Sequence, residues 1–201
     1  MRRYFGHVSI AILIFACHSQ CHFVELEVVG NFYTNTCEIR NAEDPFGPVE
    51  LLQRHNQYRR MILAGHVTNQ PAAAAMLNLD WDSTLAEGAR LWAEKCDYRH
   101  EPPQSVGENL AFSPHPHIDP VQTWFEENKY FNFGPVTAKG TFWTERYTQL
   151  VWANTSKVGC HRIHCQWLLA YSSWHEDVYY TVCRYYPKGN NIGHEPYEVK
   201  K

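Results

Sequence analysis

The sequence predicts an α+β fold in which helices and a sheet form stacked layers. Helical periodicity and capping signals lie before and between two late segments rich in β-branched and aromatic residues. Six cysteines follow residue 20, and an even number in an exported chain indicates disulfides. A chain of 201 residues is long enough for one domain with a substantial core.

Residues 1–19 have the pattern of a secretory signal peptide, so we expect a secreted, extracellular protein. Two arginines precede an apolar run from Val8 to Ala16, and small and polar residues follow. The run is too short for a membrane span, and no later segment reaches the ~20 apolar residues that a span requires. The alternative to a signal peptide is that residues 1–19 form a buried helix. Without residues 1–19 the chain has 16 Lys and Arg against 21 Asp and Glu, a net charge near −5. The absence of a basic block argues against nucleic-acid binding.

The first part of the chain divides into an extension and a helix. Residues 20–48 form a polar and aromatic N-terminal extension that holds Cys21 and Cys37. A helix is expected from Val49 to Ala64, with Gly65 as its end. Its buried face is expected to consist of Leu51, Leu52, His55, Tyr58, Ile62 and Leu63.

Two further helices carry N-terminal signals. Thr84-Leu-Ala-Glu87 has the form of a capping box at the start of a second helix. Asp119 and Pro120 resemble the N-cap and first-turn proline of a third helix from Val121 to about Tyr130.

The C-terminal part is expected to hold a short helix and two strands. The helix covers Glu145–Trp152 and leads to a turn at Gly159-Cys160. The strands are expected near Gln166–Ser172 and Val178–Tyr185. Residues 198–201 are expected to be a short polar tail.

Common enzyme signatures are absent: there is no Gly-x-Ser-x-Gly, phosphate loop, His-Glu-x-x-His or dinucleotide fingerprint. The run Cys160-His-Arg-Ile-His-Cys165 raises zinc as an alternative, but its spacing is unusual for zinc and exported cysteines pair. Paired cysteines also leave no free thiol for proteolysis. Asn154-Thr-Ser is an N-glycosylation acceptor that should lie on the surface.

Five aromatic residues flank a Gly-containing loop, residues 134–140: Tyr130, Phe131, Phe133, Phe142 and Trp143. An aromatic-walled loop can bind a flat apolar ligand. The alternative is that these rings fold onto the core.

Five short motifs follow one another between residues 49 and 197. They are His55-Asn-Gln-Tyr-Arg59, Leu79-Asp-Trp81 before Leu85-Ala86, Gly107-Glu-Asn-Leu110, Tyr147-Thr-Gln-Leu-Val-Trp152, and Val182-Cys-Arg-Tyr-Tyr-Pro-Lys-Gly-Asn190. Their order resembles the CAP superfamily of cysteine-rich secretory, antigen 5 and pathogenesis-related 1 proteins, with an SCP domain over residues 49–197. The chain resembles venom allergen-like proteins secreted by parasitic worms, among them schistosome-type flatworm members that lack the cleft histidines in the same way.

The resemblance implies a three-layer α-β-α sandwich with a central cleft. It also implies the disulfides Cys96–Cys165 and Cys160–Cys183, which leaves Cys21–Cys37. Family clefts often hold two histidines and two glutamates that coordinate a divalent cation, and the matching positions are His100, Glu108, Glu127 and Arg146. Because an arginine cannot donate a lone pair, we expect no metal and no cofactor, and a salt bridge from Arg146 to Glu108 or Glu127.

The resemblance further implies a secreted lipid-binding protein that is not an enzyme. A sterol would bind the loop from Tyr130 to Trp143. A fatty acid would lie between the first and third helices, against Leu51, Leu52, Ile62, Leu63, Val121, Trp124 and Phe125. The alternative is an immunomodulatory, allergen-like ligand of a host or plasma protein, with residues 20–48 as a contact surface. A hydrolase using His100 and Glu108 is the third hypothesis, but no nucleophile is identifiable.

Overall fold

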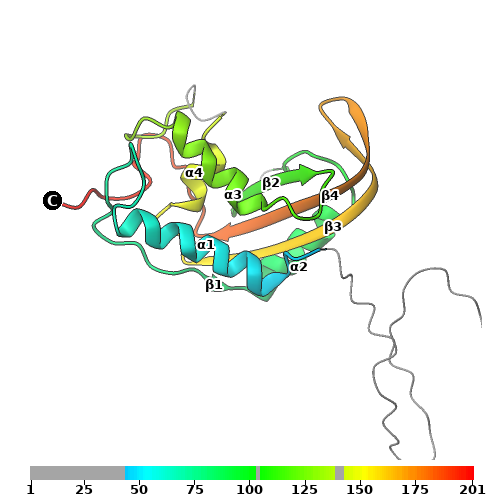
Figure 1. Ribbon diagram of the computed structural model, residues 1–201, viewed down its shortest axis with the longest axis horizontal. Helices are drawn as coiled ribbons and strands as arrows, with labels where there is room; N and C mark the ends of the chain where they lie inside the picture. The colour runs from blue at the N-terminus through cyan, green and yellow to red at the C-terminus, as the bar shows by residue number, and fades with distance from the viewer. Residues whose placement is uncertain (1–43, 103–104, 139–142) are drawn as a thin grey trace, which may run out of the picture. The chain divides into compact units, whose positions relative to one another are not determined.

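A computed structural model describes residues 44–102, 105–138 and 143–201. In this part of the chain, a sheet of order β1-β3-β4-β2 lies between two helical layers (Figure 1). One face packs against α2 (Ser83–Ala93), and the other against α1 (Pro48–Leu63), α3 (Pro120–Phe125) and α4 (Glu145–Leu150). The predicted α-β-α sandwich is confirmed.

The centre of the sheet is a long hairpin made of β3 (Lys157–Ala170) and β4 (Ser173–Tyr186). β2 (Gly107–Ser113) pairs with β4 in antiparallel fashion, and β1 (Asp80–Trp81) pairs with β3 in parallel fashion. Both hairpin strands extend well beyond the predicted segments, and β1 and β2 were not predicted. The burial of β2 follows no period of two, so its sequence lacks the usual strand signal.

The predicted turn at Gly159-Cys160 is wrong, because both residues lie inside β3. Gly159 instead allows β3 to approach the start of α2. A Cβ atom on this residue would lie 2.2 Å from the Ala86 nitrogen and 2.5 Å from the Asp82 oxygen. Any larger residue would push the first turn of α2 away from the sheet.

The first two helices begin close to the predicted positions, but the N-cap residue of α2 differs from the predicted one. α1 buries Leu51, His55, Tyr58 and Ile62 of the expected stripe, whereas Leu52 is half-buried and Leu63 is 37% exposed. In α2 the cap is Asp82, whose carboxylate accepts the Thr84 and Leu85 N–H groups. The predicted capping box at Thr84 is therefore wrong, because Thr84 already lies within the helix and Glu87 pairs with Arg90.

The third helix is shorter than predicted. Asp119 caps it as expected, accepting the Val121 and Gln122 N–H groups. α3 ends at Phe125, and the chain continues as a 3-10 helix, η1, over Glu126–Tyr130. η1 carries Glu127 toward the first turn of α4.

The disulfides Cys96–Cys165 and Cys160–Cys183 are both present. Cys160 lies directly opposite Cys183 in the hairpin, whereas Cys96–Cys165 connects the segment after α2 to β3. The zinc alternative for residues 160–165 is therefore wrong, since both sulfurs are bonded. Cys21 and Cys37 lie outside the described residues, as does the predicted signal peptide.

Both ends of the described domain are attached to it. Phe46, placed in the predicted extension, is 7% exposed in the core beside α1. Residues 198–200, predicted as a tail, hydrogen-bond to residues 72–74. Asn154 is exposed, but Thr155 of the same glycosylation signal is 1% exposed, so the tripeptide lies on the surface only in part. None of the described helices is both long and apolar enough to cross a bilayer.

A buried hydrogen-bond chain connects the central strands to α1. The Nδ1 atom of His55 lies 2.7 Å from the Leu51 oxygen and its Nε2 atom lies 2.8 Å from the Tyr185 hydroxyl. The Asn109 amide donates to that hydroxyl over 3.2 Å and to the Arg146 oxygen over 2.9 Å. Because Nδ1 must donate to a carbonyl, Nε2 accepts the Tyr185 proton and the ring is neutral.

This neutral ring predicts a loss of stability in acid. Burial lowers the pKa of His55 to about 4, from an unfolded value near 6.5. Between these values the unfolded state binds more protons, so the free energy of unfolding falls as pH drops. We expect the His55 contribution at pH 5 to be about 2 kcal/mol below its value at pH 7.

Urea denaturation of the wild type and His55→Gln at pH 5, 6 and 7 checks this prediction. The variant should lose this part of the pH dependence, whatever its stability at pH 7. The hydrogen bond to Glu108 raises the pKa of His100, so His100 stabilises the fold more in acid, opposite to His55. Because both proteins contain His100, its contribution cancels in the comparison. Equal pH slopes in the two proteins would contradict the prediction.

Candidate functional site

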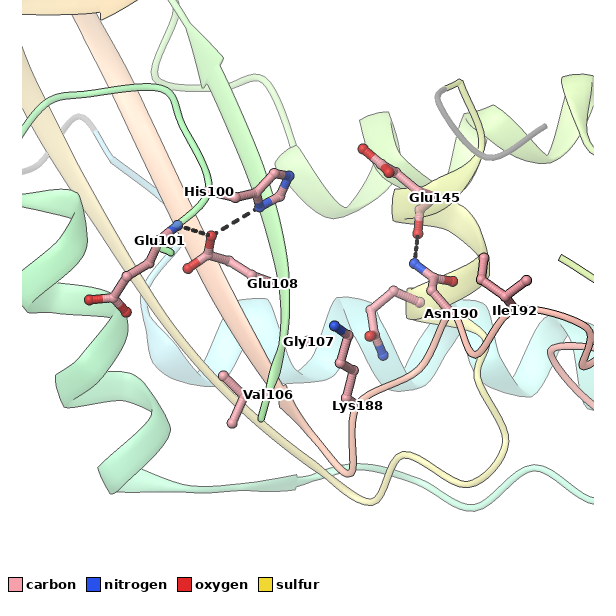
Figure 2. A pocket seen from close by; sticks show the side chains of 10 residues that line it. His100, Glu101, Val106, Gly107, Glu108, Glu145, Lys188, Asn190 and Ile192 are labelled. Carbon is pink, nitrogen blue, oxygen red and sulfur yellow. Dashed lines mark hydrogen bonds and ion pairs between the residues drawn. The ribbon is translucent and has the colours of Figure 1, made fainter. Parts of the chain in front are cut away.

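A polar cleft of about 330 Å³ lies between β2, α4 and the segment after β4. Figure 2 shows His100, Glu101 and Glu108 on one side and Glu145, Lys188 and Asn190 on the other. The remaining lining residues are Val106, Gly107, Gln149 and Ile192. The cleft therefore presents carboxylate, imidazole, amine and amide groups.

Glu108 connects the two basic groups on its side of the cleft. Its Oε1 atom lies 3.0 Å from His100 Nδ1 and accepts the Glu101 N–H over 3.2 Å. Its Oε2 atom lies 3.4 Å from the Nε atom of Arg184, which also pairs with the Glu101 carboxylate. The hydrogen bond to Glu108 raises the pKa of His100, so the charged ring is favoured there.

The other two predicted cleft residues form a pair of their own. The Arg146 guanidinium pairs with Glu127, one of the two partners expected from the sequence. Glu127 Oε2 also accepts the backbone N–H groups of Arg146 and Tyr147, over 3.2 and 3.1 Å. Because Thr144 makes no side-chain cap at this helix, Glu127 serves as the N-terminal cap of α4 from a distant part of the chain.

These four residues do not fit a divalent cation. Arg146 brings a fixed positive charge, and the carboxylate of Glu127 already accepts three N–H groups. Among the described residues, the only group of three His, Cys, Asp or Glu side chains whose ligand atoms lie close together is His55 with Cys160 and Cys183. Those sulfurs form a disulfide, so this group is not a metal site either.

The predicted aromatic loop divides into anchored and exposed rings. Phe131 contacts Tyr147 at 5.8 Å between ring centroids, and Phe133 contacts Tyr197 at 4.8 Å. Phe131 and Phe133 therefore pack on the core, as the alternative prediction stated. Tyr130 and Trp143 are 74% and 70% exposed. Phe142 lies outside the described residues.

The residues proposed for a fatty-acid channel lie mostly in the core between α1 and α3. Most of them are almost inaccessible: Leu51, Ile62, Val121, Trp124 and Phe125 are all 7% exposed or less. Phe125 stacks on Tyr58 of α1 at 4.2 Å between ring centroids. Leu52 is half-buried and Leu63 is exposed.

Residues 52–185 match the profile of the CAP family, described as the cysteine-rich secretory protein family. This chain belongs to the cysteine-rich secretory protein family. The match covers every element of the sandwich between the first turn of α1 and the end of β4.

Curated members of the cysteine-rich secretory protein family share about a third of the sequence. Venom allergen 5 of Vespa mandarinia is 34% identical over 171 residues, which cover 76% of this chain and 80% of that protein. Cysteine-rich secretory protein LCCL domain-containing 2 of Homo sapiens is 30% identical over 215 residues. That match covers 96% of this chain but 42% of the human protein, so the chain spans less than half of it.

Solved structures of the cysteine-rich secretory protein family have the same fold. The crystal structure of NaASP2 with zinc has a TM-score of 0.67 at 25% identity, covering 81% of this chain and 90% of that one. Venom allergen-like protein 4 of Schistosoma mansoni has a TM-score of 0.60 at 26% identity, covering 77% and 95%. The NaASP2 structure was determined with zinc. In this chain the fixed positive charge of Arg146 disfavours a cation beside Glu127.

Several cleft residues were not predicted as functional, namely Glu101, Glu145, Gln149, Lys188 and Asn190. Two family motifs already contained some of them. Lys188 and Asn190 end the last motif, and Gln149 lies in the motif that forms α4. Glu101 and Glu145 carry no such signal and are recognised only from the fold.

Proposed function

We propose that this chain is a secreted binding protein, not an enzyme, and that it binds a flat lipid of the sterol class through residues 130–143. One observation carries the proposal: two large aromatic rings, Tyr130 and Trp143, stand 74% and 70% exposed at the two ends of one loop. Apolar rings of this size favour removal from water, and each bears a polar group suited to a sterol hydroxyl.

The anchoring of the loop supports this use. Gln70 donates to the Asn128 and Phe131 oxygens over 3.0 and 2.7 Å. Val136 is 2% exposed and exchanges backbone hydrogen bonds with Gly193 and His194. The first part of the loop is therefore already held in place before a ligand binds, which lowers the conformational-entropy cost of binding.

Replacing Trp143 with Ala should weaken cholesterol binding about tenfold, because the ring's contact area is lost. A fluorescent sterol titrated into the purified protein measures the change. Phe142→Ala should act in the same direction. Trp174→Ala is the matched control, since this Trp is also exposed, at 65%, but lies in the β3–β4 hairpin. Equal binding by wild type and Trp143→Ala would reject the sterol loop.

Fatty-acid binding has less support. Because the predicted channel residues of α1 and α3 pack in a common core, an acyl chain would have to separate the two helices. Mass spectrometry of organic extracts from natively purified protein tests both lipid classes together.

A second function, the binding of a host or plasma protein, is supported by the relatives, which include venom allergens. A relative named salivary antigen-5, from Dipetalogaster maximus, points the same way at 31% identity. The two disulfides fit an extracellular location, which we include in the proposal. The extension up to residue 43, proposed as a contact surface, lies outside the described residues.

Catalysis has no support from the cleft lining. His100 and Glu108 form a dyad that can hold a proton. The described lining residues include no Ser, Thr or Cys that could act as its nucleophile.

A further inference from the structure

The closed end of the β3–β4 hairpin exposes several aromatic side chains. Trp167, Tyr171 and Trp174 are 49%, 74% and 65% exposed. In Figure 1 this end of the hairpin, drawn in orange, extends past the helices that cover the sheet. These residues belong neither to the polar cleft nor to the loop of residues 130–143.

The strand register places two indoles and a carboxylate on one face. Trp167 lies directly opposite Glu176, and Leu169 lies directly opposite Trp174. Paired residues point to the same side of a hairpin, and residues two apart along a strand do so as well. We call Trp167, Leu169, Trp174 and Glu176 the hairpin face.

The opposite side of the same strands packs against the domain. Leu168, which is paired with His175, is 0% exposed. The His175 ring contacts Phe112 of β2 at 4.9 Å between centroids. The hairpin face is thus the outward side of an element whose inner side is already used.

Glu176 gives the hairpin face one negative charge. No Lys or Arg occurs between Arg162 and Arg184, and Glu176 and Asp177 are the acidic residues of this span. Asp177 lies 3.7 Å from His164. Glu176 makes no hydrogen bond or ion pair within the described chain, so its charge is available beside Trp167.

The turn at the hairpin end holds an unfavourable backbone conformation. Tyr171 and Ser172 have φ angles of +51° and +64°, the left-handed region in which two-residue hairpin turns prefer Asn and Gly. A tyrosine at such a position costs conformational energy, and costs of this kind cluster at functional sites.

We propose that the hairpin face docks a basic segment of a protein partner, with a Lys or Arg side chain held between Trp167, Trp174 and Glu176. Indole faces attract cations, and a carboxylate accepts hydrogen bonds from an ammonium or guanidinium group. An anionic lipid surface would be repelled by Glu176. A choline head group has no N–H to donate to Glu176, so the trio fits a basic peptide better.

The test uses the full chain and a fluorescein-labelled decapeptide of alternating Arg and Gly, followed by fluorescence anisotropy. Glu176→Gln and Trp174→Ala should each weaken binding at least about threefold, and Trp174→Phe should restore part of it. A citrulline–glycine peptide, which has a similar shape but no charge, should not bind. Higher salt should weaken the arginine peptide.

Two matched variants separate the hairpin face from general effects. Glu195→Gln removes one exposed carboxylate of the C-terminal segment, and Trp143→Ala removes an exposed indole of the other loop. Both should bind the arginine peptide as the wild type does. Since Trp143→Ala weakens only sterol binding and Trp174→Ala only peptide binding, failure of one proposal is distinguishable from failure of the other.

Three results would overturn the inference. Equal weakening by Glu195→Gln and Glu176→Gln would mean that binding follows net charge alone. Undiminished binding by Trp174→Ala and Glu176→Gln would remove the hairpin face from the interaction. Binding to phosphatidylcholine vesicles that Trp174→Ala abolishes, without peptide binding, would assign the face to membranes.

Discussion

Replacing Arg59 with Met should lower the free energy of unfolding by about 4 kcal/mol. Arg59 is 0% exposed, and within the described chain its guanidinium has carbonyl partners and no carboxylate partner. It donates over 2.9 to 3.1 Å to the oxygens of Leu77, Leu150, Trp152 and Thr155. Methionine fills similar space but leaves all four oxygens without this donor.

The arrangement explains how a buried cation is tolerated. Leu150 ends α4, so its carbonyl has no partner within the helix and carries partial negative charge where the guanidinium binds it. Burial lowers the pKa of Arg59 to about 10, which still leaves it charged at neutral pH. Arg59→Lys should therefore also destabilise, since one ammonium group cannot reach four spread oxygens.

Urea denaturation with the disulfides intact measures this effect. Arg60→Met is the matched control, because Arg60 is the next residue of α1 and is exposed. Its loss should change stability by less than about 0.5 kcal/mol. Similar losses for the two variants would show that the carbonyl contacts contribute little.

The second large effect is expected at the cap of α4. Glu127→Ala should lower the free energy of unfolding by about 3 kcal/mol. Burial raises the pKa of Glu127 and the charge of Arg146 opposes that shift, so the carboxylate charge itself is not the main source of stability. The cost comes from two helix N–H groups and a guanidinium that lose their acceptor.

Two variants isolate this reason. Glu127→Gln keeps one acceptor oxygen and should cost less than Glu127→Ala. Glu126→Ala removes the neighbouring carboxylate, which is 49% exposed and pairs with Lys129, and should be nearly neutral. Adding Arg146→Ala to Glu127→Ala should cost less than the sum of the two single changes, as a double-mutant cycle measures. Strict additivity would contradict the coupling.

The sequence predicted those features that depend on local periodicity or on family motifs. The stripe of α1, the N-cap at Asp119 and the disulfides of the described chain belong to this group. β2 was not predicted, because it is covered on both faces and lacks alternation. The N-cap of α2 was predicted at Thr84, two residues after the observed cap Asp82, because the Thr84 sequence offers an equally good local signal.

The cleft was predicted less completely, for a physical reason. The choice between Glu108 and Glu127 as partner of Arg146 depends on how η1 meets the first turn of α4, and no local pattern encodes that distance. The same holds for Arg59, which lies on the buried stripe of α1 but whose four acceptors come from segments 18 to 96 residues away. Contacts of this kind follow from the assembled fold.

The cap provided by Glu127 has a consequence for how this protein can change. Glu127 precedes the aromatic loop of residues 130–143, and its carboxylate accepts the N–H groups of Arg146 and Tyr147, which follow the loop. One side chain therefore connects the two ends of the loop. The exposed residues near these ends, Tyr130 and Trp143, can then be exchanged without removing the cap of α4. A change of Tyr130 or Trp143 would therefore alter an exposed surface of the protein while the sandwich beneath it stays the same.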